Sequence, residues 1–334
     1  MKNKILTGFL LVGGWGSLSA QNVGSNYARQ VNTLIGTKGV GLTSGYLYPG
    51  ATYPYGMVQF TPSYFSKRSG FVINQLSGGG CEHMGNFPTF PVKGKLKMSP
   101  DNILNYRINI SEEKGHAGYY EAKVQEDIHA KLTVTERTGM ASYEYPADQQ
   151  YGTVIIGGGI SATPIEQAAI VITAPNKCEG YAEGGNFCGL RTPYKVYFVA
   201  EFDTDALESG TWKRNELKPN TTFAEGEYSG VYFTFDVDKK KNVQYKIGVS
   251  YVSVENAREN LKAENTGWDF LQIQNQAESK WNHYLGMIEV EGTNPDRTTQ
   301  FYTHLYRSFI HPNVCSDVNG EYMGADFRVH KSRS

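Results

Sequence analysis

The feature that most constrains the fold is a two-residue hydrophobic period, which recurs along most of the chain. It is clearest in GYYEAKVQEDIHAKLTVTERTGMASYEY, residues 118–145, where polar residues alternate with a set of apolar ones: Ala122, Val124, Ile128, Ala130, Leu132 and Val134. Such alternation is typical of strands that bury one face. Further strand candidates are TVIIGGGI, KVYFVAEFDTD, GVYFTFDVD and VQYKIGVSYVSV. Short strands separated by turns predict an antiparallel β-sandwich rather than βαβ units. The segment DKKKN, residues 238–242, is predicted to be a solvated hairpin turn.

Near Ser253 the period changes from that of strands to that of helices. Ser253 is predicted to cap one helix over VENARENLKAEN, Thr266 a second, and Asn294 a third that begins at Pro295. The second helix has apolar residues at four-residue spacing, Ile273, Ala277, Trp281 and Leu285, and the third has the stripe Phe301, Leu305 and Phe309. GMIEVEG between them is predicted to be a short strand. A β-rich region therefore precedes a helical one.

The first twenty residues, MKNKILTGFLLVGGWGSLSA, have the charged start, apolar centre and small residues of a secretory signal peptide. No later stretch is long or apolar enough to predict a membrane span. We therefore expect a secreted or periplasmic protein. The expected divisions are a signal peptide at 1–20, a β-sandwich domain at 21–253, a helical linker at 254–300 and the start of another domain at 301–334.

The charge balance excludes some classes of partner. With 32 Lys and Arg against 33 Asp and Glu, the net charge is −1, which gives no electrostatic reason to expect nucleic acid or an anionic membrane as partner. Aromatic residues make up 13% of the chain, and 23 of them are tyrosines. This content fits a large β core, and tyrosine-rich surfaces also suit sugars, because a ring covers C–H groups while its hydroxyl forms hydrogen bonds.

Four cysteines allow three disulfide pairings. In an exported chain we favour a bond between Cys178 and Cys188, which would close a loop over CEGYAEGGNFC; free thiols are the alternative. No set of Cys and His residues has zinc-site spacing.

Two glycine-rich stretches interrupt the β-like region, at residues 31–62 and 77–87. The second, SGGGCEHMGNF, suggests a tight turn, a structural crossing or a ligand that approaches the backbone closely. The segment GTKGVG in the first lacks the lysine-serine pair of a phosphate-binding loop and does not precede a helix, so we discount that interpretation.

Together these stretches resemble the N-terminal part of glycoside hydrolase family 92, which consists of secreted, exo-acting α-mannosidases. The matching motifs occur in the family's order: Ile35-Gly36-Thr37, Pro49-Gly50-Ala51, Pro54-Tyr55-Gly56-Met57 and Ser77-Gly78-Gly79-Gly80-Cys81. The resemblance continues through GYYEAKV, IGVSYVSVENARENL and WNHYLGMIEVEG to FYTHLYRSFIHPNVCSDVNGEYMGAD. It covers nearly all of the chain after the expected signal peptide.

The resemblance implies a mainly β fold: an antiparallel β-sandwich of the galactose-mutarotase-like supersandwich type, linker helices, and the truncated start of an (α/α)6 barrel. It also implies calcium-dependent hydrolysis of terminal α-mannosides of mannose-containing glycans, such as N-glycans, with inversion. Inversion requires two carboxyl groups about 6.5–9.5 Å apart. In the family these groups and the calcium ligands belong to the missing C-terminal barrel domain, so no catalytic or metal-binding residue is assigned here. We expect the chain to be inactive alone.

The resemblance suggests two candidate substrate contacts. Asp326 matches the aspartate of a Y-x-G-x-D segment, and a carboxylate can accept two hydrogen bonds from sugar hydroxyls; the alternative is a loop-capping aspartate after Gly324. The second is the loop of Gly79, Gly80 and Cys81, whose bare backbone could approach a sugar hydroxyl or the facing domain. Cys81 could instead be a small buried packing residue.

Two other functions stay open. One is a non-catalytic carbohydrate-binding or structural β-sandwich module. The other is an aldose mutarotase, which would need a positioned histidine and carboxylate, and no pairing of the seven histidines stands out. His83 is predicted to be a surface or domain-facing residue rather than a ligand.

Overall fold

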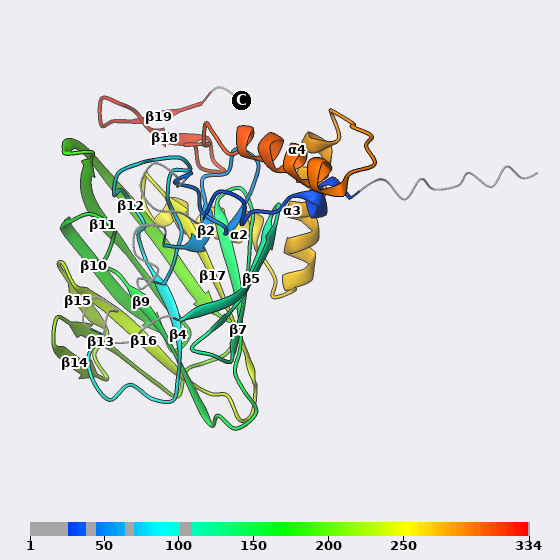
Figure 1. Ribbon diagram of the computed structural model, residues 1–334. Helices are drawn as coiled ribbons and strands as arrows, with labels where there is room; N and C mark the ends of the chain where they lie inside the picture. The colour runs from blue at the N-terminus through cyan, green and yellow to red at the C-terminus, as the bar shows by residue number, and fades with distance from the viewer. Residues whose placement is uncertain (1–25, 38–44, 64–69, 101–108, 333–334) are drawn as a thin grey trace, which may run out of the picture.

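The computed structural model describes residues 26–37, 45–63, 70–100 and 109–332. The expected signal peptide, at 1–20, and part of the first glycine-rich stretch, at 38–44, lie outside these residues. The fold is mainly β, with two large sheets that pack face to face (Figure 1). All pairings between the described strands are antiparallel, as predicted.

The two sheets contain eight and nine of the described strands. The order in the first is β1 (Ala51–Thr52), β2 (Gln59–Pro62), β3 (Phe71–Val72), β4 (Thr89–Lys93), β9 (Tyr151–Gly157), β16 (Ser229–Asp236), β13 (Glu208–Lys213) and β14 (Glu216–Pro219). The order in the second is β15 (Phe223–Glu225), β10 (Ile165–Ala174), β11 (Lys177–Phe187), β12 (Leu190–Phe202), β17 (Asn242–Ser250), β8 (Thr138–Glu144), β7 (Ile128–Val134), β6 (Tyr119–Val124) and β5 (Ile110–His116).

The strand predictions are confirmed. Residues 118–145 form β6, β7 and β8, and all six apolar residues named above are buried. The four other candidates correspond to β9, β12, β16 and β17. The segment 238–241 is largely exposed, as predicted, but the prediction of a hairpin is wrong, because it connects β16 to β17, which lie in different sheets and do not pair.

Aromatic side chains from the two sheets meet in the core. The Phe202 ring on β12 lies 5.0 Å from those of Phe233 and Phe235 on β16 and 5.3 Å from that of Tyr245 on β17, measured between centroids. All four are buried, and burying one such side chain contributes about 1.5–3 kcal/mol. This packing makes the sandwich a rigid support for the loops at its ends.

The start of each of the longer helices is set by a side chain that caps its first amides. The structure contains α1 (Tyr27–Gln30), α2 (Val254–Glu264), α3 (Phe270–Leu285) and α4 (Pro295–Ser308). Ser253 and Asn294 cap α2 and α4 as predicted. The prediction of Thr266 as the second cap is wrong, because the Asp269 carboxylate accepts from the Gln272 amide at 3.0 Å and α3 begins at Phe270.

Two details of the helical region also differ from the prediction. On α4 the fully buried aromatic residues are Tyr302 and Tyr306, whereas Phe301 and Leu305 of the predicted stripe are half-buried. GMIEVEG, at 286–292, forms no strand, since it pairs with none of the described strands.

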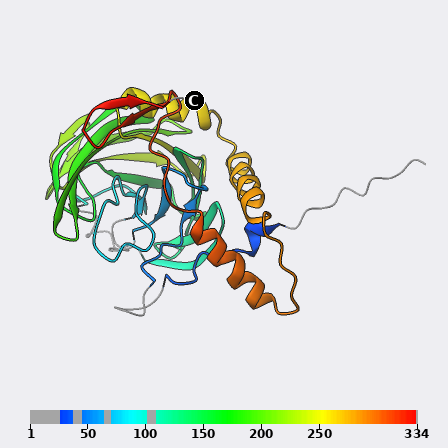
Figure 2. The same cartoon turned by 90° about the horizontal axis from the view of Figure 1, so that it is seen from above.

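The helices and a small hairpin occupy one end of the sandwich. Figure 1 shows α3, α4 and the hairpin of β18 (Glu321–Met323) and β19 (Val329–Lys331) at the same end, and Figure 2 shows α3 and α4 to one side of the sheets. α2 instead packs on the outer face of β12, where Ala257 and Leu261 cluster with Val199. The chain after α4 thus returns across the sandwich end to reach the hairpin.

A charge cluster around the buried Glu278 joins α3 to the sandwich and to α1. The Glu278 carboxylate lies 2.8 Å from His116 Nε2 and accepts hydrogen bonds from Arg29 and from Gln274. Burial alone would raise the pKa of Glu278, but the bonds from His116, Gln274 and Arg29 outweigh it and lower that pKa to about 2. The charged carboxylate therefore stabilises this junction.

The disulfide prediction is wrong. The bond joins Cys81 to Cys188, while Cys178 is a buried free cysteine and Cys315 an exposed one. The segment from Cys178 to Cys188 is mostly strand β11 rather than a loop, and ten extended residues separate its ends by about 33 Å. Cys178 faces the core, whereas Cys188 lies in the turn after β11.

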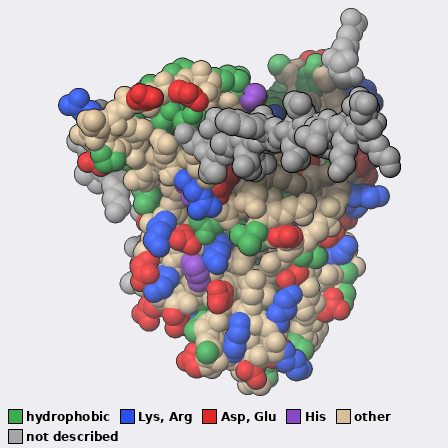
Figure 3. Space-filling model, turned by 90° about the vertical axis from the view of Figure 1, so that its right-hand side faces the viewer, with side chains coloured by type: hydrophobic (Ala, Val, Ile, Leu, Met, Phe, Trp, Pro, Cys, Tyr) green, Lys and Arg blue, Asp and Glu red, His purple; other side chains and the backbone are tan. Residues whose placement is uncertain are grey.

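Charged side chains are mixed on the face shown in Figure 3, where Lys and Arg alternate with Asp and Glu. Charges of opposite sign also pair: Lys123 on β6 with Glu112 on β5, and Lys93 on β4 with Asp127 in the turn before β7. Among the described residues, no helix combines the length and the apolar character needed to cross a membrane.

Candidate functional site

A cavity of about 650 Å³ lies between the sandwich and the chain that follows α4. This volume falls within the range of about 300–1,000 Å³ that is usual for ligand sites. Its described lining comes from the first sheet and its loops (Met57, Gln59, Asn74, Leu76, Met84), from β11, β12 and the residues after β17 (Glu183, Thr192, Pro193, Tyr194, Lys195, Tyr197, Tyr251), and from the C-terminal segment (Asn313, Val314, Cys315, Met323, Gly324, Ala325, Phe327). The cavity is thus lined both by the β-sandwich and by the segment that follows α4.

Tyrosines and amides form a fixed hydrogen-bond network beneath the cavity. The Tyr194 hydroxyl donates to Asn86 Oδ1 at 2.8 Å, and Asn74 Nδ2 donates to the same oxygen at 3.1 Å. Burial raises the pKa of Tyr194 to about 12, so its hydroxyl stays protonated near neutral pH and remains a donor. Burial also raises the pKa of Tyr251, another lining residue. The network holds these side chains in place before any ligand binds.

The glycine-rich loop turns around a buried histidine. The Leu76 amide donates to His83 Nε2 at 2.7 Å, so Nδ1 carries the proton and bonds the Cys81 carbonyl oxygen at 2.6 Å. Burial lowers the pKa of His83, consistent with a neutral ring. The residue is buried inside the loop, so the prediction of a surface position is wrong, whereas a position that faces another domain stays a prediction. A Cβ on Gly79 would lie 2.7 Å from the ring, whereas one on Gly80 would meet its nearest neighbour at 3.9 Å. The His83 ring therefore leaves no room for a side chain at Gly79.

The same loop is tied to two distant segments. The disulfide joins Cys81 to the turn between β11 and β12, and the Ser77 amide donates to His311 Nε2 at 3.0 Å. Gly79, Gly80 and Cys81 are not among the residues that line the cavity, although Leu76 and Met84, on either side of them, are. The three predicted residues thus border the cavity, and their contact with a substrate stays a prediction.

Asp326 lies in the exposed turn of the β18–β19 hairpin. Its carboxylate lies 2.9 and 3.1 Å from His330 Nε2 and accepts from the Arg328 amide at 3.2 Å. The bond with His330 is the main cause that holds the pKa of Asp326 below its usual value, so the group is ionised near neutral pH. Its neighbours Ala325 and Phe327 line the cavity, whereas Asp326 itself does not.

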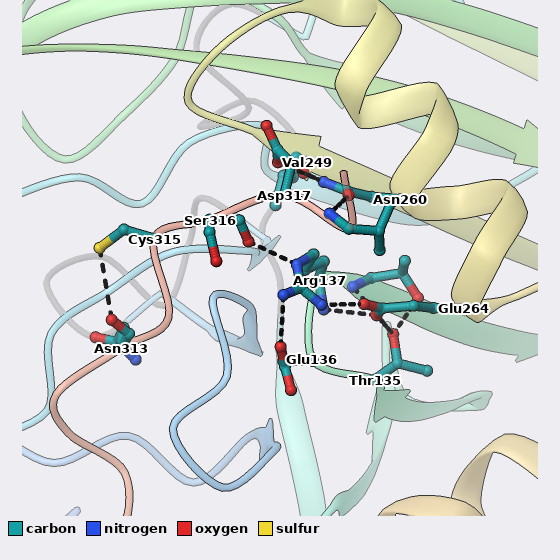
Figure 4. Close-up of polar contacts among 12 residues, drawn as sticks. Thr135, Glu136, Arg137, Val249, Asn260, Glu264, Asn313, Cys315, Ser316 and Asp317 are labelled. Atoms are coloured by element: carbon teal, nitrogen blue, oxygen red, sulfur yellow. Dashed lines mark hydrogen bonds and ion pairs between the residues drawn. The ribbon is translucent and has the colours of Figure 1, made fainter. Parts of the chain in front are cut away.

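Arg137 fixes the segment that forms the C-terminal wall (Figure 4). Its Nε donates to the Ser316 carbonyl oxygen at 2.7 Å, and its Nη1 lies 2.6 Å from Glu264 Oε1. The side chains of this ion pair are only 13% and 15% exposed. The Glu264 carboxylate also accepts from the Thr135 hydroxyl at 2.6 Å. One arginine therefore connects the sandwich, the end of α2 and residue 316.

Asp317 fixes the next residue of that wall in a second network. Asp317 is 2% exposed, and its carboxylate accepts from the Ser250 hydroxyl at 2.6 Å, Asn256 Nδ2 at 2.8 Å and Asn260 Nδ2 at 2.6 Å. Upstream, the Val314 amide donates to the Tyr55 carbonyl oxygen at 2.7 Å. The 313–317 segment is thus held at both ends by the sandwich and by α2.

Sequence reasoning missed Arg137, Glu264 and Asp317, because their partners are far away in the chain. Asp317 shows no local pattern beyond an acidic residue in a turn-like segment. Only the fold brings it to Ser250 and Asn260.

The described residues that line the cavity can bind a ligand, but they include few groups that could transfer a proton. Among the described residues that line it, Glu183 is the one carboxylate, and its Oε2 lies 3.5 Å from Lys195 Nζ. No group of three or more His, Cys, Asp or Glu residues in the described ranges could hold a metal ion. Calcium prefers six to eight oxygen ligands, so the described residues do not fit this ion.

The fold and the cavity define a class: a β-sandwich joined to the start of a helical domain, with a small-molecule cavity where the two meet. Comparison with known families agrees. The model of the glycosyl hydrolase family 92 N-terminal domain matches residues 30–250, and that of the glycosyl hydrolase family 92 catalytic domain matches residues 256–334. The chain therefore belongs to glycosyl hydrolase family 92, which confirms the resemblance.

Individual relatives give the same picture. An uncharacterized secreted glycosidase of Arthroderma benhamiae is 26% identical, over 88% of this chain and 42% of that protein. The solved family GH92 alpha-mannosidase of Bacteroides thetaiotaomicron has a TM-score of 0.81 at 24% identity, over 92% of this chain and 44% of its own. The family GH92 inverting mannosidase of the same organism has a TM-score of 0.81 at 25% identity, over 91% and 43%. The chain spans less than half the length of each of these relatives.

Proposed function

We propose that this chain forms the sandwich side of the sugar pocket in a secreted, exo-acting α-mannosidase that hydrolyses terminal α-mannosides of glycans with inversion. The observation that carries the proposal is the position of the cavity, between sandwich residues and residues 313–327, which lie within the part that the catalytic-domain model matches. The names of the relatives support it, since one is an inverting mannosidase and another has been solved in complex with mannoimidazole.

The chain's own contribution is binding and orientation. An inverting hydrolase needs an acid and a base about 6.5–9.5 Å apart. The described lining offers Glu183 alone, paired with Lys195. Both catalytic carboxylates and the calcium ligands would then come from elsewhere in the full-length enzyme, where calcium would bind sugar hydroxyls.

Within this proposal Asp326 contacts the terminal sugar. Its ionised carboxylate stands in an exposed turn beside lining residues, and its lone pairs can accept hydrogen bonds from two adjacent hydroxyls. The backbone of Gly80, which is exposed next to the cavity, would face the same ligand.

The test uses the full-length gene product with an aryl α-mannoside. We expect release of mannose that is initially the β-anomer, followed by NMR. Asp326→Asn should lower kcat/KM about 10- to 100-fold, since a hydrogen bond to a charged group contributes about 1.5–3 kcal/mol. Asp148→Asn, in the exposed turn before β9, is the matched control and should change nothing.

Three results would contradict these statements separately. An enzyme that releases no mannose refutes the function, and initial release of the α-anomer refutes inversion. An unchanged kcat/KM in Asp326→Asn refutes the role of that residue alone. Tight binding of mannobiose by the 334-residue chain, in calorimetry, would favour a non-catalytic module instead.

A further inference from the structure

Two tyrosines and an ion pair share the outer face of β11 and β12. Tyr181 lies directly opposite Tyr197 in the antiparallel register, and Glu183 lies directly opposite Lys195. The residues between them on β11, such as Ala182, are buried against the core, so these four side chains point away from it. We call Tyr181, Glu183, Lys195 and Tyr197 the β11–β12 platform.

The platform is packed and partly open to solvent. The two tyrosine ring centroids are 6.1 Å apart, and Lys195 Nζ lies 4.1 Å from the Tyr181 centroid and 5.6 Å from that of Tyr197. Lys195 and Glu183 retain 35% and 33% exposure of their side chains while they pair at 3.5 Å. All four side chains are half-buried. Since the cation and the carboxylate restrain each other, the rings are held in a defined orientation.

The platform continues from the cavity onto the sheet. Tyr197, Glu183 and Lys195 belong to the cavity lining, whereas Tyr181, which lies on β11 two residues before Glu183, does not. Beyond Tyr181, the directly opposite residue on β10 is Ala169, which has a small side chain. A row of aromatic surface with hydrogen-bonding groups therefore leads out of the cavity.

This chemistry suits a saccharide more than a protein surface. Tyrosine rings cover the C–H faces of sugars, and the ammonium and carboxylate groups can donate to and accept from their hydroxyls. An exo-acting enzyme holds one terminal sugar in its pocket, so the remainder of the glycan must leave through the pocket mouth. We propose that the β11–β12 platform binds the sugar units on the leaving-group side of the cleaved bond. This inference rests on the proposed function.

The test compares two substrates of the full-length enzyme. α-Mannosyl fluoride has no sugar beyond the terminal one, whereas a linear α-linked mannotetraose has three. Tyr181→Ala should lower kcat/KM about 3- to 10-fold for the tetraose, mainly through KM, as one aromatic contact contributes about 0.5–1.5 kcal/mol. It should leave the value for the fluoride unchanged. Tyr181→Phe, which keeps the ring, should behave like the wild type.

Tyr228→Ala is the matched control, because Tyr228 also lies near a cation, with the Arg214 guanidinium 5.0 Å from its ring, but not among the cavity residues. It should change the activity on neither substrate. Equal losses of Tyr181→Ala on both substrates, or no loss on either, would overturn the inference while the proposed function stands. A wild-type enzyme that hydrolyses neither substrate would refute the proposed function, and this inference with it.

Discussion

The contact between Arg137 and Glu264 allows a quantitative test of how the cavity wall is fixed. Arg137→Met removes the ion pairs with Glu264 and Glu136 and the donor to the Ser316 carbonyl oxygen, and it leaves the Glu264 carboxylate buried with fewer partners. Breaking a buried pair by removing one member destabilises by about 3–5 kcal/mol. As the two side chains keep 13% and 15% exposure, we expect the lower end, about 3 kcal/mol.

The loss of stability should be smaller when both partners are replaced than when Arg137 alone is replaced. Replacing both residues, in Arg137→Met with Glu264→Met, should lower the free energy of unfolding by less than Arg137→Met alone, because no buried charge is then left unpaired. The resulting coupling energy should be about 1–3 kcal/mol. Arg191→Met is the control, since the Arg191–Glu166 pair is 72% and 44% exposed and should change stability by less than about 1 kcal/mol.

Urea unfolding of each variant measures these differences, and hydrogen exchange at Val314 reports the wall itself. The Val314 amide is bonded to the Tyr55 carbonyl oxygen, so its exchange should speed up in Arg137→Met and not in Arg191→Met. A loss below about 1 kcal/mol in Arg137→Met, or strictly additive effects in the double variant, would refute the reasoning.

Three further predictions concern single side chains. Glu278→Gln should destabilise the protein at neutral pH, because the pKa of Glu278 in the folded protein is lowered to about 2. The difference in free energy of unfolding between wild type and variant, measured in urea, should persist above pH 4.5 and shrink as the pH falls towards 2. A difference that does not change with pH would contradict this. Cys188→Ser should lower unfolding stability by about 2–4 kcal/mol, and peptide mapping without reduction should find Cys81 linked to Cys188, while a link from Cys178 would disprove the pairing. Gly79→Ala should lower the Tm measurably and Gly80→Ala should not, because only the first places a Cβ within 2.7 Å of a neighbour; equal effects would contradict this packing.

Local signals in the sequence predicted most of the fold. The alternation in residues 118–145 predicted β6 to β8 because one buried face suffices to give a two-residue period. Ser253 and Asn294 were predicted correctly as caps because each bonds an amide only two or three residues away. Thr266 and Asp269 are both suitable caps, and the sequence did not distinguish them. In the structure the Asp269 carboxylate accepts from the Gln272 amide, and Trp268 lies before the helix, with Lys246 Nζ 4.4 Å from its ring centroid.

Long-range contacts explain what could not be predicted. The sequence showed the four cysteines, but the pairing depends on β11 extending as a strand, which carries Cys188 away from Cys178 and towards the glycine-rich loop. Likewise, Phe301 and Leu305 form an apolar stripe on α4, yet Tyr302 and Tyr306 are buried, because Trp281 of α3 packs on Tyr306 with 4.6 Å between centroids.

The candidate site was predictable only in outline. The motif resemblance directed attention to the glycine-rich loop and to the segment around Asp326, and the structure places both beside one cavity. The resemblance included residues 313–315 but did not indicate that they form a cavity wall, and it did not include the tyrosines of β12.

The central claim is that these residues shape a sugar pocket without supplying its pair of catalytic carboxylates. The most direct measurement is the release of mannose from an aryl α-mannoside by the purified, folded 334-residue chain, with calcium present. We predict no release above that of the buffer. Sustained release over many turnovers would contradict the claim.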